Sequence, residues 1–429
     1  MSQTLKAVRG TRDLLPPETA LWNRIEATAR AVFARYNFGE IRTPIFEDTL
    51  LFARGVGEET DIVSKEMYTW EDRARAASEK PQSLTLRPEN TAGVVRAYIE
   101  HKLGETGQLQ KLYYIGPQFR RERPQKGRYR QFWQIGAEAI GPQSAGSESP
   151  LRDAEVLEML SSLLNELGIS GWTLELNSVG SSADRARYND ALRAALEPVA
   201  SQLCADCQRR AVTNPLRVLD CKVPEDQAII ETLPKIAEYL DEDSKKHFDA
   251  VIAALDAAGV PYHLNPRLVR GLDYYTRTTF EFTHGGLGAQ NALLGGGRYD
   301  GLSEAIGGPK APGIGFAIGL DRLVLTLQGL ETTETIAEKI NAYIAPLGET
   351  VNPAALKLAR ELRRAGLSVE LGDGSFRLKK SFEAADKVAR KIVILGEDEV
   401  QSGILTVKDF STGAQTKVPR AELDRFLQQ

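Results

Sequence analysis

The sequence predicts a mixed α/β protein, with a large domain in which helices flank a strand-rich sheet and a small α/β domain at the C-terminus. The chain has 429 residues, a length that corresponds to about two to three domains. Residues 184–257 are mostly helical and interrupt two strand-rich regions, so we expect them to form a helical insertion. After residue 338, strands and helices alternate, which is typical of an α/β module.

The first strand-rich region begins with a helix over 18–36, because its apolar residues recur at helical spacing. A β-type segment follows over 40–46. Pro44 within it indicates an edge strand or an irregular strand, since proline cannot donate a backbone hydrogen bond. The next elements are expected in the order strand 83–87, helix 89–103, strand 111–116, strand 129–140, turn-rich loop 141–150 and helix 151–167.

The second strand-rich region follows the insertion, with strands over 261–264 and 274–283. Glycine-rich stretches at 285–288 and 295–297 indicate turns or close approaches of the backbone, because glycine has no Cβ. A helix over 319–328 closes the large domain.

The large domain is expected to span residues 1–330 and the small domain residues 338–429, with the boundary between them. In the small domain the sequence predicts a strand, a helix that Asn352 and Pro353 cap and that Gly366 ends, and then a strand, a helix and a strand. These elements cover residues 342–347, 352–364, 368–371, 378–390 and 391–396.

The composition is that of a soluble globular protein, with 42% hydrophobic and 26% charged residues. No apolar run reaches the roughly 18 residues of a membrane helix, and the N-terminus lacks the apolar core of a signal peptide. We therefore expect a cytoplasmic protein with no membrane association. The net charge of −4 means that any contact with a nucleic acid uses a local basic patch.

Three cysteines, Cys204, Cys207 and Cys221, are too few for a disulfide framework. A structural zinc site normally needs four ligands, and the nearest histidine, His247, lies well away in the sequence. We therefore expect no metal site, and interpret the cysteines as packing residues of the helical insertion. The four histidines form no visible Ser-His-Asp or HExxH arrangement.

The most informative stretch is FRRERPQKGRYRQF (119–132), in which six cationic residues stand among Phe119, Tyr129 and Phe132. Guanidinium groups bind phosphates and aromatic rings stack on bases, so this combination suits a nucleotide held by its phosphates. A charge run alone more often forms a solvated cationic hairpin. The apolar strands on both sides favour phosphate binding, because they place the cations on a loop above a rigid floor.

Two further segments carry polar residues in unusual settings. In LTLRPENTAG (84–93), Glu89 and Thr91 would face a pocket from a helix N-terminus, although a glutamate that simply caps the helix is the more ordinary interpretation. In RLVRGLDYYTRTTFEF (267–282), Arg270 lies between apolar residues, where a buried guanidinium needs an anion. A single tyrosine on a strand is usually a core residue, so the tyrosines alone indicate little.

Two glycine-rich segments complete the set. LLGGGRYDGL (293–302) could let the backbone approach a ligand, but it lacks the strand–GxGxxG–helix setting of a dinucleotide fold. GIGFAIGLDRLVLTL (313–327) carries Arg322 early in a helix. A lone helix arginine is usually at the surface, yet the preceding strand would bring this one toward the same sheet.

Together these segments resemble the bacterial type of histidyl-tRNA synthetase, a class II aminoacyl-tRNA synthetase, over essentially the whole chain. The resemblance begins at VRGTRDLLP (8–16), and the helix and strand that end at Pro44 look like class II motif 1. FRRERPQKGRYRQF looks like motif 2 and GIGFAIGLDRLVL like motif 3, which alone would indicate only the class. LVRGLDYY and GGGRYDG look like the two histidine-specific signatures, and this pairing is highly specific.

The resemblance implies an antiparallel catalytic sheet of about six or seven strands flanked by helices, a helical insertion, a C-terminal α/β anticodon-binding domain, and a homodimer built through motif 1. It implies that L-histidine and ATP, with Mg²⁺ bridging the phosphates, form histidyl-adenylate and pyrophosphate. The histidyl group would then be transferred to the terminal adenosine of tRNA(His). Because a polar pocket rejects analogues that leave its buried groups unpaired, editing is not expected.

The resemblance also implies ATP-binding roles for five residues of motifs 2 and 3. Arg120 would hold the α-phosphate and the substrate carboxylate, with Glu122 near the adenine. Phe132 and Arg322 would stack on the two faces of the adenine, and Arg128 would contact the outer phosphates. The loop tip around residues 123–126 is expected to meet the acceptor end of the tRNA.

Catalysis is implied for Arg270 and Arg120 at the α-phosphate, where fixed cations stabilise the developing charge without a protein nucleophile. The residues implied in histidine binding are Glu89, Thr91, Arg120, Gln134, Glu138, Arg270, Tyr274 and Tyr275.

The histidine-binding residues have separate implied contacts. Glu89, Thr91 and Gln134 would bind the ammonium group. Glu138 and Tyr275 would hydrogen-bond the two imidazole nitrogens, while Tyr274 lines the pocket.

Two other functions fit parts of the pattern. The synthetase-like regulatory subunit of ATP phosphoribosyltransferase keeps the catalytic fold but tends to lose Arg270-type residues and the anticodon domain, both of which are present here. Another class II synthetase or an adenylate-forming ligase would need a different amino-acid pocket, and LVRGLDYY argues against that.

Overall fold

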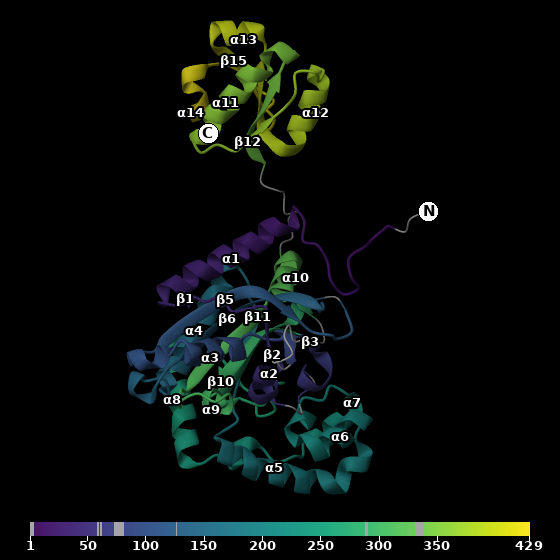
Figure 1. The fold of residues 1–429 in the computed structure, drawn as a ribbon, viewed down its shortest axis with the longest axis vertical. Helices are drawn as coiled ribbons and strands as arrows, with labels where there is room; N and C mark the ends of the chain where they lie inside the picture. Colours follow the sequence, from purple (N-terminus) through teal and green to yellow (C-terminus); the bar gives the residue numbers. More distant parts are fainter. Residues whose placement is uncertain are drawn as a thin grey trace. The chain divides into compact units, whose positions relative to one another are not determined.

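The computed structural model describes residues 4–57, 60, 62–72, 81–125, 127–287, 291–330 and 339–429. The chain divides into two compact units, Met1–Thr332 and Thr333–Gln429 (Figure 1). The polar stretch in which the sequence placed the domain boundary lies largely at 331–338, outside the described residues.

The described part of the large unit is built on an eight-stranded sheet in the order β1-β5-β6-β11-β10-β9-β7-β8. The six central strands pair in an antiparallel manner, and the two edge strands pair in parallel. The strands are β1 Gly39–Glu40, β5 Gln110–Phe119, β6 Gln131–Ile140, β11 Gly313–Gly319, β10 Ala292–Arg298, β9 Thr276–His284, β7 Trp172–Ser178 and β8 His263–Leu264.

The six central strands agree with the predicted antiparallel sheet of six or seven strands, whereas the whole sheet has eight. The difference comes from β1 and β8, which are two residues long and pair only at the edges. The segment predicted over 40–46 is also not one strand. It separates into β1 and β2 (Phe46–Asp48), with no regular structure on either side of Pro44, because proline cannot take part as a donor in a ladder.

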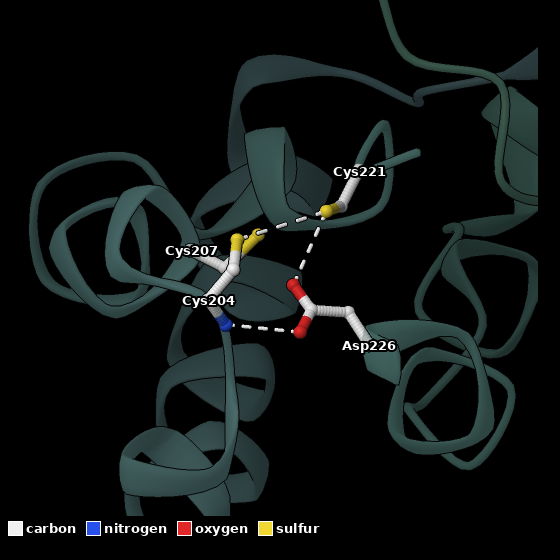
Figure 2. Close-up of side chains that lie close together, drawn as sticks. All are labelled: Cys204, Cys207, Cys221 and Asp226. Carbon is white, nitrogen blue, oxygen red and sulfur yellow. Dashed lines mark hydrogen bonds between the residues drawn. The ribbon is translucent and has the colours of Figure 1, made fainter. Parts of the chain in front are cut away.

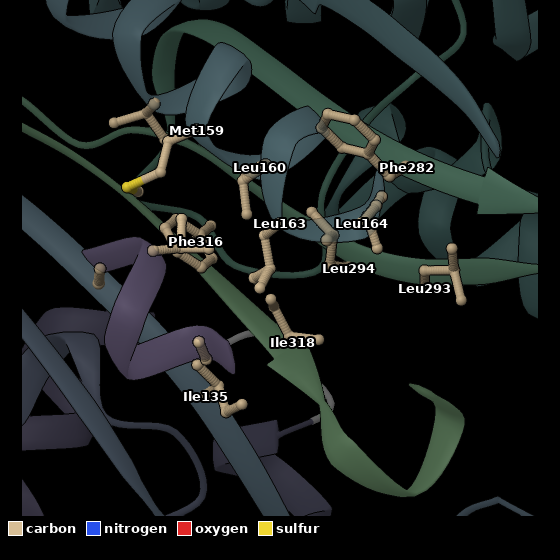
Figure 3. Close-up of a cluster of buried hydrophobic side chains, with 14 of the residues drawn as sticks. Ile135, Met159, Leu160, Leu163, Leu164, Phe282, Leu293, Leu294, Phe316 and Ile318 are labelled. Carbon is tan, nitrogen blue, oxygen red and sulfur yellow. The ribbon is translucent and has the colours of Figure 1, made fainter. Parts of the chain in front are cut away.

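The sheet has one apolar face, which four helices cover. These are α1 (Glu18–Arg35), α4 (Pro150–Glu166), α8 (Glu242–Ala258) and α10 (Leu320–Leu330). Their apolar stripes pack on alternate residues of the central strands to form the main core (Figure 3). In β6, for example, the core residues are Ile135, Ala137 and Ala139, so the residues between them face the other side.

The opposite face carries smaller elements. A three-stranded sheet in the order β2-β4-β3 is formed by β2, β4 (Gln82–Leu86) and β3 (Tyr68–Asp72). Helices α2 (Thr49–Val56), α3 (Thr91–Glu100) and α9 (Leu302–Ala305) form two small apolar clusters beside it. The strand over 83–87 and the helix over 89–103 are thereby confirmed, with the helix shorter at both ends.

The helical insertion has a core of its own, built by α5 (Ser182–Leu196), α6 (Ala205–Thr213) and α7 (Pro224–Ile230). Figure 1 shows these three helices together at one end of the large unit. The expected range of 184–257 is wrong at its end, because α8 packs on α4 and places Val251 and Leu255 in the main core. The buried core of the insertion ends at Leu240.

One interpretation of the sequence placed a turn at the glycines 295–297. They lie instead inside β10. A Cβ atom on Gly296 would come within 2.1 Å of the Gly315 carbonyl oxygen on β11. The close backbone approach that the glycines indicated is therefore present, within a sheet. The stretch at 285–288 does contain a tight turn, Gly285–Leu287.

The small unit contains, within its described residues, a five-stranded sheet in the order β13-β12-β14-β15-β16. The first three strands are parallel and the last two antiparallel. Its elements are β12 Ile340–Pro346, α11 Asn352–Arg364, β13 Val369–Leu371, α12 Leu378–Val388, β14 Ala389–Leu395, α13 Glu397–Ser402, β15 Ile404–Asp409, β16 Gln415–Pro419 and α14 Leu423–Gln428.

The predicted strand–helix–strand–helix–strand order of the small unit is confirmed, and the structure adds β15, β16, α13 and α14. One detail was wrong. Asn352 is the first residue of α11 and not its cap, and its side chain accepts a hydrogen bond from the Gly374 amide at 2.9 Å. Among the described residues of the protein, no helix is long and apolar enough to cross a membrane.

Candidate active site

A cavity of about 990 Å³ lies against the face of the eight-stranded sheet that is opposite the main core. Of the twelve residues that the sequence assigned to the site, all but Glu138 line this cavity. They come from segments far apart in the chain, since the start of α3, motif 2 with β6, the segment before β9 and α10 all contribute. The predicted residues at the cavity wall are Glu89, Thr91, Arg120, Glu122, Arg128, Phe132, Gln134, Arg270, Tyr274, Tyr275 and Arg322.

Strand alternation explains the polar floor of the cavity. On β6, Gln134 stands on the face opposite the core residue Ile135, and on β9, Glu281 stands between the core residues Phe280 and Phe282. The strands therefore separate the apolar interior from polar groups that face a ligand.

Glycines on β10 and β11 give these polar side chains their space. A Cβ on Gly295 would come within 2.6 Å of the guanidinium carbon of Arg270. A Cβ on Gly315 would come within 1.7 Å of a carboxylate oxygen of Glu138. The glycines of the GGGRYDG and GIG segments are thus required by contacts at the site, because any larger residue would displace Arg270 or Glu138.

One end of the cavity is formed by the N-terminus of α3. The carboxylate of Glu89 accepts hydrogen bonds from the amides of Thr91 at 2.8 Å and Ala92 at 3.0 Å. The capping interpretation is therefore correct, but Glu89 also lines the cavity. Burial raises its pKa, while these two amides and the nearby charge of Arg120 favour the ionised form.

Glu138 lies behind the cavity wall. Its side chain is fully buried, and one oxygen accepts a hydrogen bond from the Thr91 hydroxyl at 2.7 Å, while the other has no hydrogen-bond partner in the part of the chain that the structure describes. Burial raises the pKa of Glu138 to about 8. Glu138 does not line the cavity itself, whereas its neighbours Thr91, Tyr299 and Gly315 do.

Two tyrosines at this end carry no role in the sequence analysis. Tyr114 on β5 and Tyr299 after β10 are both buried and both line the cavity. The Tyr299 hydroxyl has no hydrogen-bond partner within the described structure. The sequence contains a signal for each of these tyrosines. Tyr299 lies in GGGRYDG, and Tyr114 follows the core residue Tyr113 on a strand, so that its side chain points to the opposite face. With Tyr274 and Tyr275, whose ring centroids are 4.8 Å apart, they form a polar aromatic pocket.

The other end of the cavity is cationic. Arg128 donates to Glu122 at 3.3 Å, and Arg322 donates to the Ala292 carbonyl at 2.8 Å. Burial, and next the positive charge of Arg128, lower the pKa of Arg322. Arg120 connects this end with the N-terminus of α3, because its Nε donates to the Pro88 carbonyl at 2.9 Å while its guanidinium carbon lies 5.2 Å from the ring centroid of Phe132. Like charges held together in this way indicate a site for an anion.

The N-terminal segment holds the motif 2 loop against α10. The amide of Arg130 donates to the Gly10 carbonyl at 2.7 Å, and Arg12 donates to Asp321 of α10 at 2.9 Å. The guanidinium of Arg12 also lies 4.8 Å from the ring centroid of Tyr129. Of the loop tip assigned to tRNA, residue 126 lies outside the described structure.

Arg270 lies between the two ends. It forms a hydrogen-bonded ion pair with Glu281. Burial opposes its charge, but Glu281 and Tyr275 outweigh burial and raise its pKa. Its positive charge also helps to lower the pKa of Arg322 at the cationic end. A permanently charged arginine therefore lies where the polar aromatic pocket meets the cationic region.

An antiparallel sheet with a cationic pocket on one face and a separate α/β unit is the architecture of a class II aminoacyl-tRNA synthetase. The family "Histidyl-tRNA synthetase" matches residues 10–323, and the family "Anticodon binding domain" matches residues 341–429. The chain belongs to the histidyl-tRNA synthetase family.

Individual relatives agree with this assignment. The chain is 71% identical to the histidine–tRNA ligase of Koribacter versatilis, over 99% of this chain and 96% of that protein. It is 56% identical to the histidine–tRNA ligase of Solibacter usitatus, over 98% of each chain. Among solved structures, the apo histidyl-tRNA synthetase of S. aureus matches with a TM-score of 0.80 and 38% identity, covering 99% of this chain and 100% of that one.

Proposed function

We infer that the protein is a histidine–tRNA ligase, which activates L-histidine with ATP and transfers the histidyl group to the 3′ end of tRNA(His). The observation that carries this conclusion is the convergence of four sequence segments on one cavity. LVRGLDYY and GGGRYDG supply Arg270, Tyr275 and Tyr299, while motifs 2 and 3 supply Arg120 and Arg322. Identity of 71% over nearly the full length of a histidine–tRNA ligase supports the same activity.

The first step needs no nucleophile from the protein. A carboxylate oxygen of histidine attacks the α-phosphorus of ATP, and the bond to the pyrophosphate oxygen breaks. Arg120 and Arg270 stabilise the charge that builds on the α-phosphate. Their positions support this role. The charge of Arg270 interacts with Tyr275 and with Arg322. The charge of Arg120 interacts with Glu89, and its guanidinium lies against the ring of Phe132.

The remaining nucleotide contacts follow from the cationic end of the cavity. Phe132 and Arg322 stack on the adenine, Glu122 binds near it, and Arg128 contacts the outer phosphates. Magnesium bound together with ATP would neutralise part of the phosphate charge. Glu122 and Glu281 are carboxylates of the cavity that would hold such an ion, and each is paired with an arginine.

Histidine binds at the polar aromatic end. Glu89, Thr91 and Gln134 bind the ammonium group. The side-chain oxygen of Gln134 supports this role, because it is buried and has no hydrogen-bond partner among the described residues. Tyr275 binds one imidazole nitrogen, and Glu138, which accepts a hydrogen bond from the Thr91 hydroxyl, binds the other.

The second step joins the carbonyl carbon of the adenylate to a ribose hydroxyl of the terminal adenosine, and AMP leaves. The small unit binds the anticodon region of the tRNA, in agreement with the family match over residues 341–429. The enzyme acts in the cytoplasm, and the absence of a membrane-spanning helix among the described residues is compatible with this location.

A homodimer is formed through the segment around motif 1. An exposed apolar patch supports this assembly, because Ile45, Phe46, Leu50 and Trp70 are 40% to 57% exposed on β2, α2 and β3 or next to them. The rings of Phe46 and Trp70 lie 6.1 Å apart, so the patch is continuous there. Grouped apolar residues at a surface are typical of a protein interface.

The alternative function, a regulatory subunit of ATP phosphoribosyltransferase, would require the protein to bind ligands but not to catalyse a reaction. The two arginines at the α-phosphate position and the separate small unit favour the enzyme.

The test is histidine-dependent exchange of labelled pyrophosphate into ATP by the purified protein. We expect exchange with L-histidine and none with other amino acids, because the pocket groups need both imidazole nitrogens. Intact ATP binding without histidine-dependent exchange would contradict the enzyme assignment and favour the regulatory function.

A further inference from the structure

The three cysteines of the chain meet Asp226 in the helical insertion, away from the sheet. Their ligand atoms, three sulfurs and a carboxylate oxygen, all lie within 4.8 Å of one another. The sulfurs of Cys204 and Cys221 are 3.9 Å apart, and the Cys221 sulfur is 3.2 Å from Asp226 Oδ2. Figure 2 shows the four side chains turned toward a common point.

Local structure brings these residues together. Cys204 precedes the first residue of α6 and Cys207 lies in its first turn, so the helix start places both sulfurs on one side. Cys221 follows the short helix Pro215–Val218, and Asp226 lies in α7. The amide of Cys204 donates to Asp226 Oδ1 at 2.9 Å, which fixes the carboxylate with Oδ2 toward the sulfurs.

One sulfur pair has the spacing expected in a tetrahedral metal site, and all four ligand atoms lie within 4.8 Å of one another. Zinc–sulfur bonds of about 2.3 Å at tetrahedral angles separate two sulfur ligands by about 3.8 Å, close to the 3.9 Å between Cys204 and Cys221. A disulfide would need sulfurs about 2.05 Å apart, and all three cysteines are free.

The charge of Asp226 also indicates a cation. Its side chain is 1% exposed, and among the described residues no lysine, arginine or histidine forms an ion pair with it. A buried carboxylate normally has a cationic partner or coordinates a metal. We propose that Cys204, Cys207, Cys221 and Asp226 bind one structural zinc ion. Three thiolates and one carboxylate are a donor set that suits zinc, and binding would release the three thiol protons.

The expectation that the cysteines hold no metal rested on the lack of a fourth ligand. The structure supplies one in Asp226, five residues after Cys221. A single aspartate carries no distinctive sequence signal, whereas the fold places its oxygen beside the sulfurs.

The proposed ion has a structural consequence for the active site. Leu219, Cys221 and Gln227, on the segments that it joins, line the active-site cavity. Arg267, at the start of RLVRGLDYY, donates to Gln227 at 2.7 Å and to Glu231 at 2.6 Å. Zinc would therefore stabilise this wall of the cavity. The segment that carries Arg270 packs against the same wall.

The test is elemental analysis of the full-length protein, purified without chelator and under reducing conditions. We expect about one zinc ion per chain, and almost complete loss of zinc in Cys204→Ser. The matched control is Asp206→Asn, which removes an exposed carboxylate in the same helix and its surface ion pair with Arg209. This variant should keep its zinc, whereas Asp226→Asn should bind it more weakly.

A second measurement does not depend on the folding of a variant. Cobalt exchanged into the wild-type protein should give the intense visible absorption of a tetrahedral ion and a thiolate-to-cobalt charge-transfer band. Removal of the metal should increase amide hydrogen exchange around residues 203–230 and leave residues 339–429 unchanged. Reduced protein that contains no zinc and binds neither added zinc nor cobalt would overturn the proposal. A disulfide among the three cysteines, or a chain that retains only iron, would also overturn it.

Discussion

Arg270 and Glu281 illustrate how single residues are placed for chemistry. Arg270 sits over Gly295, pairs with Glu281 and lines the cavity beside Tyr275. A guanidinium held in this way keeps its charge in spite of burial, because the carboxylate raises its pKa. In the proposed reaction, this arrangement would let it stabilise negative charge without rearrangement.

We expect Arg270→Ala to slow histidyl-adenylate formation by a factor of about 10² to 10³, the usual cost of removing one such group. Histidine affinity should change much less, because the ammonium and imidazole groups have other partners. Single-turnover adenylation measures the first quantity, and calorimetric titration with histidine measures the second. Arg270→Lys should restore only part of the rate, since an ammonium group lacks the planar fork of a guanidinium. Equal losses in rate and affinity would instead identify Arg270 as a residue that binds the ground state.

At the scale of elements, β10 has two faces with different functions. Gly295 faces the flexible end of Arg270, whereas Gly296 faces the backbone of Gly315 and the ring of Phe280 in the core. The same residue type therefore serves the active site at one position and sheet packing at the next. Period-two alternation of the strand is the cause.

Alanine at these two positions should have separable effects. Gly295→Ala should displace Arg270 and lower the adenylation rate, with a change in unfolding free energy of less than about 1 kcal/mol, because a side-chain end can move. Gly296→Ala should destabilise the large unit by about 1–3 kcal/mol, because its Cβ would meet rigid backbone. Chemical denaturation and pyrophosphate exchange measure the two quantities.

Gly329→Ala is the control for this pair, because a Cβ on this helical glycine meets no described residue within 4 Å. It should be neutral or slightly stabilising. If both Gly295→Ala and Gly296→Ala lost stability but neither lost activity, the separation of the two faces would be refuted.

At the scale of the whole molecule, the two units have separate cores. The main core joins the four covering helices to the eight-stranded sheet, and the core of the small unit contains only residues from 342 to 427. Every residue of the cavity belongs to the large unit. Activation of histidine and recognition of the anticodon region are therefore expected to be separable.

A chain that ends at residue 330 should keep histidine-dependent pyrophosphate exchange. Its charging of tRNA(His) should fall by about tenfold or more, which corresponds to the loss of at least 1.4 kcal/mol of binding. Exchange and charging assays on the same preparation measure both. Residues 339–429 alone should fold, as far-UV circular dichroism can show, but should support neither reaction. Loss of exchange in a folded truncated chain would show that the small unit contributes to the first step.

Much of this protein could be predicted from sequence because the informative signals are local. Helical and strand periodicity located α1, α4, β5, β6 and the elements of the small unit. The motifs also predicted residues of one site. All of them except Glu138 line the cavity. The end of the insertion was mispredicted because α8 has an ordinary amphipathic pattern, which does not reveal the surface on which it packs.

The sequence by itself determined the family, the order of most elements and the chemical types at the active site, because motifs and periodicities are properties of neighbouring residues. Tertiary structure alone decided that Glu138 lies behind Thr91, that Gly295 and Gly315 make room for charged groups, and that Asp226 joins the cysteines. Each of these depends on contact between segments distant in the chain. Such contacts follow from how whole faces of strands and helices pack, so no local pattern records them.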